Sequence, residues 1–100
     1  MSSRKLVRDR IPDIIKADGG NPITYIAGED EYRERLYYKL QEEAAEFFAS
    51  RDPEELADLI EVIRAIAATM GMTHEDLEAL REKKAEERGR FTRRIILEEP

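Results

Sequence analysis

Apolar side chains recur every three or four positions along two long stretches in the middle of the chain. The first stretch covers about residues 30–50, and its repeating positions are Leu36, Leu40, Ala44 and Phe47. The second covers about residues 53–70, and its repeating positions are Leu56, Leu59, Ile60, Ile63, Ala67 and Met70. This spacing is that of one face of an α-helix. The sequence therefore predicts two long amphipathic helices.

A short polar break separates these two stretches at residues 50–53. Pro53 suits the first turn of a helix, and Asp52 before it suits the N-cap. Gly71 follows the second stretch and is a typical C-terminal stop. A tight turn at the break would make the two helices antiparallel, so we expect a long helical hairpin.

Weaker signals predict the elements on either side of the hairpin. A short helix is expected to begin at Pro12 and to stop at Gly19. A fourth helix is expected between a capping Thr73 and Gly89.

The remaining segments favour extended structure. Residues 1–10 look irregular, residues 23–26 are β-prone, and residues 92–97 read as a terminal strand. That strand could pair with residues 23–26 or with residues 6–7. The expected fold is mainly α: a compact helical bundle forming one domain over residues 1–100, with short terminal β segments.

The second long helix carries apolar residues on two sides. Val62, Ala65 and Ile66 extend its apolar surface beyond the main stripe. A helix of this kind is buried in its own domain or packs against another subunit. In a chain of 100 residues we expect a subunit interface, and hence a homodimer or higher homo-oligomer.

Four carboxylates are placed symmetrically about the predicted turn. Glu43 and Glu46 are three residues apart, as are Glu55 and Asp58. Residues at this spacing share a helix face, so an antiparallel pair would direct all four acids into one cleft. Four anions in one cleft repel one another unless a cation lies between them. The pattern predicts a site for a hard divalent ion with oxygen ligands.

The two acidic pairs differ in how well structure alone explains them. Glu55 could instead form a capping-box variant with Asp52. Asp58 lies mid-helix in a residue type that forms helices poorly, and Glu43 lies inside the apolar stripe. Carboxylate ligands favour Mg²⁺, with Mn²⁺ as a substitute, over softer metals. A di-iron centre would need Glu-x-x-His motifs, which the chain lacks.

Composition narrows the classes of partner. The formal charge is −6, which disfavours binding of duplex nucleic acid. The absence of cysteine excludes disulfides and thiolate metal sites, and no apolar run is long enough for a membrane span. No signal peptide is visible, so we expect a cytoplasmic protein with no membrane partner. Basic residues cluster near both ends, around an acidic middle, as suits a small polyphosphate ligand.

Three separated motifs resemble one known family. The residues K-L-Q-E-E-A-A-E at 39–46 and E-L-A-D at 55–58 are similar to the E-x-x-E…E-x-x-D signature of MazG-like, all-α nucleoside triphosphate pyrophosphohydrolases. Residues 5–12, K-L-V-R-D-R-I-P, and the later R-G-R-F and R-I-I-L at 88–91 and 94–97 resemble the ends of a compact subgroup. Arg90 replaces a glycine of that pattern, and the link between the acidic pairs is shorter than in MazG itself.

This resemblance implies an activity and roles for the site residues. It implies Mg²⁺-dependent hydrolysis of a nucleoside triphosphate between the α- and β-phosphates, with house-cleaning of nucleotide pools as the expected role. It implies Mg²⁺ held by the four carboxylates, with Glu43 also orienting the attacking water. Candidate phosphate-binding cations are Lys39, Lys84, Arg88, Arg94 and Arg8. Two alternatives stay open: a non-catalytic helical interaction module, and a nucleotide-binding relative without turnover.

Overall fold

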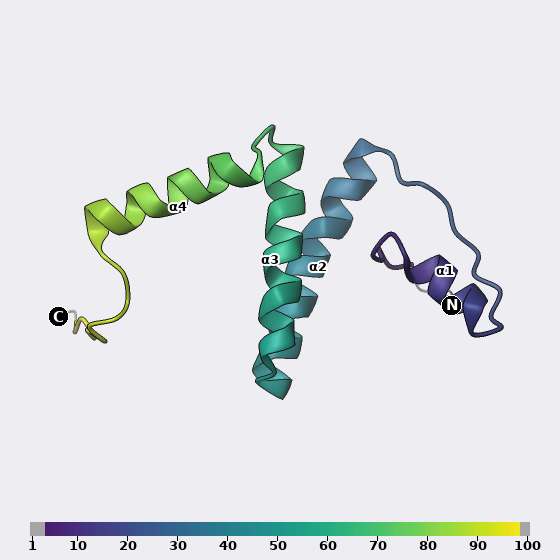
Figure 1. Cartoon of the computed structure of the whole chain (residues 1–100), viewed down its shortest axis with the longest axis horizontal. Coiled ribbons are helices and arrows are strands. Elements are labelled where there is room, and N and C mark those ends of the chain that lie inside the picture. The colour runs from purple at the N-terminus through teal and green to yellow at the C-terminus, as the bar shows by residue number, and fades with distance from the viewer. Residues whose placement is uncertain (1–3, 99–100) are drawn as a thin grey trace.

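Four helices joined by irregular segments make up the chain (Figure 1). The computed structural model describes residues 4–98. The helices are α1 (Ile11–Ala17), α2 (Glu29–Ser50), α3 (Pro53–Thr69) and α4 (His74–Arg88). The prediction of a mainly α fold is therefore confirmed, and each helix begins and ends close to its expected position. None of these helices is both long enough and apolar enough to cross a bilayer.

The predicted β segments are wrong for residues 4–98, where no residue is in a strand. Ile23 and Ile26 are each 96% exposed, and Ile96 is 86% exposed. Residues 23–26 lie in the link between α1 and α2, whereas residues 92–97 follow α4 on the opposite side of the molecule (Figure 1). A strand needs a partner, so β propensity alone does not produce a sheet here.

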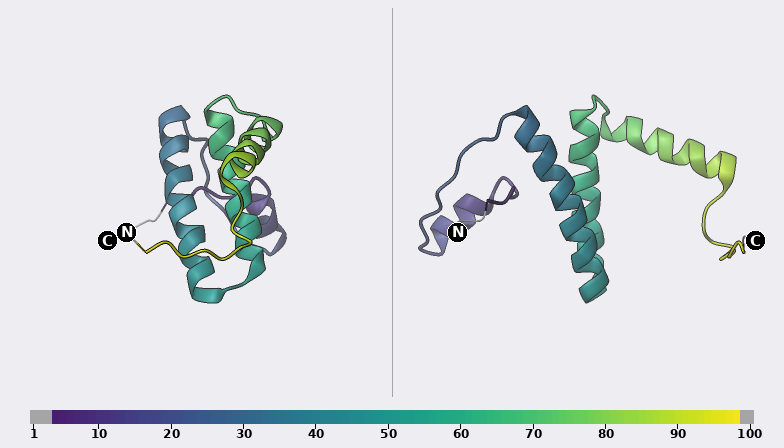
Figure 2. Two further views of the ribbon diagram at one scale, coloured as in Figure 1. Left: turned by 90° about the vertical axis from the view of Figure 1, so that its left-hand side faces the viewer. Right: turned by 180° about the vertical axis from the view of Figure 1, so that it is seen from behind.

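Helices α2 and α3 lie side by side and run in opposite directions (Figures 1 and 2). The two residues between them make the turn. Arg51 adopts a left-handed conformation, with φ 59°, and its N–H donates to the Phe47 carbonyl at 2.7 Å. Asp52 accepts a 3.0 Å hydrogen bond from the Glu54 N–H, which confirms it as the N-cap of α3. This short turn brings the C-terminal half of α2 beside the N-terminal half of α3.

The buried core of the described chain is small. Its apolar members are Leu36, Val62 and Ala67, and the fourth buried residue is Glu43. The radius of gyration is 17.6 Å, against about 13 Å for a compact domain of this length. The chain exposes 9107 Å², whereas a compact monomer of 11.6 kDa would expose about 5,800 Å². The single chain is thus less compact than the bundle we expected.

Much of the excess surface comes from α3 and from the arm formed by α4. Leu56, Ile60 and Ile63 on α3 are between 41% and 51% exposed. Helix α4 leaves the end of α3 and projects away from α2 (Figures 1 and 2). The chain therefore presents an apolar α3 face that its own helices leave open.

Candidate metal centre

Glu43 is the carboxylate that α2 buries against α3. Its exposed fraction is 8%, and its Oε2 atom is buried without a hydrogen-bond partner. Its other oxygen, Oε1, lies 3.6 Å from the Nζ atom of Lys39, one helical turn earlier. A buried carboxylate oxygen without a donor is costly unless a cation or a proton compensates it.

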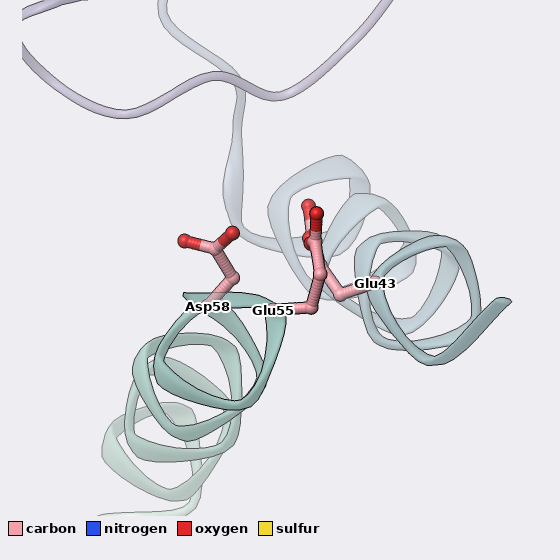
Figure 3. A group of neighbouring side chains, drawn as sticks. All are labelled: Glu43, Glu55 and Asp58. Carbon is pink, nitrogen blue, oxygen red and sulfur yellow. The ribbon is translucent and has the colours of Figure 1, made fainter. Parts of the chain in front are cut away.

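Glu55 and Asp58 approach Glu43 from the first two turns of α3. Each of the three residues offers a carboxylate oxygen, and these oxygens all lie within 4.8 Å of one another. Figure 3 shows the three side chains pointing to the same side of the helix pair, with Glu43 and Glu55 next to each other and Asp58 set apart on α3. Oxygen ligands bind divalent ions at about 2.0–2.6 Å, so this separation matches the width of one coordination sphere. The residues present therefore fit a hard divalent cation.

The capping-box alternative for Glu55 is wrong. The Asp52 N–H that such a box would occupy donates instead to the Ser50 Oγ atom at 3.1 Å. The Oε2 atom of Glu55 is buried and has no hydrogen-bond partner. Its side chain is consequently available to the acidic cluster rather than to the helix end.

Glu46 lies at the margin of this cluster. It is exposed and does not belong to the group of three whose oxygens lie within 4.8 Å of one another. It is close enough for its carboxyl group to contribute to the raised pKa of Glu55. Its role as a fourth ligand stays a prediction.

Electrostatics within the cluster favour a bound cation or proton. The pKa of Glu55 is raised to about 7, first by burial and then by the close approach of the Glu43 carboxyl and the charge of Glu46. A cation placed among these oxygens would remove the same repulsion. The cluster is thus an acidic cleft with two unpartnered buried oxygens, Glu43 Oε2 and Glu55 Oε2.

Two of the predicted phosphate-binding cations lie beside the cluster. The Arg8 Nη2 atom donates to Asp58 Oδ1 at 2.7 Å, and this pair joins residues that are 50 positions apart. The Nζ atom of Lys39 lies 3.5 Å from Glu42 Oε2 and 3.6 Å from Glu43 Oε1. Both cations are therefore placed to meet an anion bound at the cleft.

The other three predicted cations lie elsewhere in the single chain. Lys84 and Arg88 belong to the last two turns of α4, and that end of α4 points away from α2 and α3 (Figure 1). Arg94 lies in the segment after α4, where its φ is 57°. The structure does not bring them to the carboxylates of their own chain. Their proposed contact with phosphate stays a prediction that would need another copy of the chain.

Sequence reasoning missed two cations near the cluster. Lys5 donates to Glu42 Oε1 at 3.1 Å, and Arg35 donates to the Arg4 carbonyl at 2.8 Å. Arg35 shares a face of α2 with Lys39, four residues on, and this spacing was visible in the sequence. The path of residues 4–8 beside α2 could not be predicted from the sequence, because an irregular segment has no periodicity.

Comparison with known proteins adds one relative. An uncharacterised protein of Mycolicibacterium smegmatis is 48% identical over 46 residues, which are 46% of this chain and 47% of that protein. The chain thus matches about half the length of this curated relative. No family model and no solved structure match the chain. The MazG-like resemblance consequently stays a prediction that rests on the motifs.

The raised pKa of Glu55 predicts how stability depends on pH. Between its ordinary value of 4.5 and about 7, the folded protein holds a proton on Glu55 that the unfolded chain releases. In the metal-free protein, Glu55 therefore lowers the free energy of unfolding as the pH rises through this interval. We expect Glu55→Gln to abolish this loss, so that the variant gains stability relative to the natural chain between pH 4.5 and 8.

Urea denaturation of both proteins with a metal chelator present measures this difference. Other carboxyls with lowered pKa act in the opposite direction, but they are common to both proteins. Glu54→Gln is the matched control, because Glu54 is an exposed neighbour outside the cluster. A stability difference that stays constant with pH would contradict the assignment.

Proposed function

We propose that this chain is a Mg²⁺-dependent nucleoside triphosphate pyrophosphohydrolase, which releases a nucleoside monophosphate and pyrophosphate. The observation that carries the proposal is the acidic cleft of Glu43, Glu55 and Asp58, with its unpartnered buried oxygens. The three separated motifs that resemble MazG-like enzymes support the same activity. The expected ligands of the ion are these three residues together with Glu46.

Each group has a defined part in the proposed reaction. Bound Mg²⁺ would polarise the phosphate oxygens and lower the pKa of water. Glu43 would orient the attacking water, because its carboxylate is the most buried of the cluster. The water oxygen bonds to the α-phosphorus, the bond from that phosphorus to the bridging oxygen breaks, and the β- and γ-phosphates leave together. The water's proton passes to solvent through the carboxylates.

A second proposal concerns the partner of the exposed α3 face. The excess of exposed area over a compact monomer is roughly 3,300 Å² per chain, which exceeds the area of about 1,000–2,500 Å² that each partner buries in an obligate homodimer. We propose that a second copy of the chain covers this face.

The alternative function is a non-catalytic helical interaction module. The exposed apolar residues of α3 favour it, since such a face suits docking. It does not account for the buried unpartnered oxygen of Glu43, which a docking module has no reason to retain. A docking module should bind neither Mg²⁺ nor a non-hydrolysable nucleotide, whereas a relative without turnover should bind both.

Turnover tests the enzyme proposal. We expect Mg²⁺-dependent release of pyrophosphate from at least one nucleoside triphosphate in a panel of normal and damaged nucleotides. Glu43→Gln and Asp58→Asn should each lower kcat by about a hundredfold or more, because each removes a charged ligand of the ion. Circular dichroism should show unchanged helix content. Glu54→Gln, outside the cluster, should keep its activity; full activity in either cluster variant would refute the site.

Sedimentation velocity tests the second copy. The natural chain should sediment as a dimer or larger species at micromolar concentration. Ile60→Glu places a charge on the open α3 face, where Ile60 is 51% exposed, and should shift the protein toward monomer. Ile23→Glu is the matched control, because Ile23 is 96% exposed on a loop and should leave assembly unchanged. A monomeric natural chain would overturn the proposal.

A further inference from the structure

A basic pocket lies beside the acidic cleft, on the N-terminal side of Glu43. Its volume is about 390 Å³. Four cations and one carboxylate line it: Arg4, Lys5, Arg35, Lys39 and Glu42. The pocket therefore has an excess of positive charge, although the formal charge of the whole chain is −6.

Two segments that are distant in sequence build this pocket. Arg35, Lys39 and Glu42 lie on one face of α2, at spacings of four and three residues. Residues 4–6 form the opposite wall. The Arg35 Nη1 atom donates to the Arg4 carbonyl at 2.8 Å, and Lys5 donates to Glu42 at 3.1 Å. The irregular N-terminal segment is thus fixed against α2 by charged contacts at two points.

The cations of the pocket exceed the anions that face them. Glu42 accepts from both Lys5 and Lys39, and this sharing lowers its pKa, chiefly through the hydrogen bond from Lys5. Arg35 has Glu31 at 3.3 Å. The side chains of Lys39 and Arg35 are only 23% and 30% exposed, so water screens their charges incompletely. An anion of more than one charge would offset the repulsion among them.

Lys39 connects this pocket to the acidic cleft. Its Nζ atom is 3.5 Å from Glu42 in the pocket and 3.6 Å from Glu43 in the cleft. Because α2 rises 1.5 Å per residue, Arg35 is about 12 Å from Glu43 along the helix axis. One elongated ligand could therefore have an end at the carboxylates and the rest among the cations, provided that it is strongly anionic.

We propose that this basic pocket is a diphosphate-binding site, which holds the β- and γ-phosphates of the substrate and then the pyrophosphate product. The inference rests on the proposed function for the identity of the substrate, but the pocket itself is defined by its own residues. Guanidinium and ammonium groups are the side chains that bind phosphate oxygens, and Arg35 has N–H donors beyond those that bond the Arg4 carbonyl and Glu31.

Calorimetric titration with sodium pyrophosphate tests this inference on the full chain. A chelator keeps divalent ions out, so binding does not depend on the acidic cleft or on turnover. We expect the natural chain to bind pyrophosphate with an affinity that falls as salt rises. The double variant Lys5→Gln/Arg35→Gln should raise the Kd for pyrophosphate about tenfold or more, because it removes two charge-assisted contacts.

The matched control is Lys16→Gln/Lys83→Gln, which removes the same net charge from two exposed positions outside the pocket. Its Kd for pyrophosphate should match that of the natural chain. Equal weakening in both double variants would show a general charge effect and overturn the inference, as would absence of binding to the natural chain. Lys5→Gln alone is a second variant whose folding is safe, because the Lys5 side chain is 64% exposed; it should weaken binding severalfold, and an unchanged Kd would count against the pocket.

The same titrations separate the two proposals. Pyrophosphate binding that depends on Lys5 and Arg35 without any nucleotide turnover would support the pocket and refute the enzyme. Nucleotide turnover, together with pyrophosphate binding that does not depend on Lys5 and Arg35, would support the enzyme and refute the pocket. Repeating the titration with a non-hydrolysable nucleoside triphosphate distinguishes a nucleotide as the source of the diphosphate from free pyrophosphate.

Discussion

Repulsion among carboxylates that α2 and α3 hold in one cleft is the constraint on which the rest of the structure depends. Leu36 of α2 and Val62 of α3 are buried where the chain packs these two helices together, and Glu43 is buried in the same pair, beside Glu55. Burial and the neighbouring acids raise the pKa of Glu55 to about 7. Two oxygens are left without donors. Hydrophobic packing thus holds in place a charge arrangement that a divalent cation would stabilise.

The cations of the chain are arranged around this constraint. Arg8 balances part of the charge of Asp58 from a segment that is far away in sequence. Lys39 stands where the acidic cleft meets the basic pocket, and Arg35 extends the positive side along α2. One helix therefore carries two adjoining surfaces of opposite charge. This arrangement suits a ligand with one phosphate that binds the metal and a second anionic group that lies among the cations. Because residues 4–6 line the basic pocket, the N-terminal segment is part of the site.

Helical periodicity predicted α2 and α3, and capping and stop residues predicted α1 and α4. The three-residue spacing of the acids about the turn was sufficient to predict that Glu43, Glu55 and Asp58 come together. Other features depend on tertiary structure that no local pattern encodes. The segment at 23–26 has β-prone residues but no strand beside it. The contact of Arg8 with Asp58 follows from the path of an irregular segment. The direction in which α4 leaves α3, which carries Lys84 and Arg88 away from the carboxylates, is not encoded by the periodicity of either helix.

Helix α3 takes part in both the acidic cluster and the open surface of the chain. One side of α3 faces the carboxylate of α2, and another side exposes apolar residues. The most direct test of the central claim is a crystal structure grown with Mn²⁺, with the ion located by its anomalous scattering. The account predicts a peak within about 2.0–2.6 Å of oxygens from Glu43, Glu55 and Asp58. Carboxylates turned apart toward solvent, with no peak between them, would contradict it.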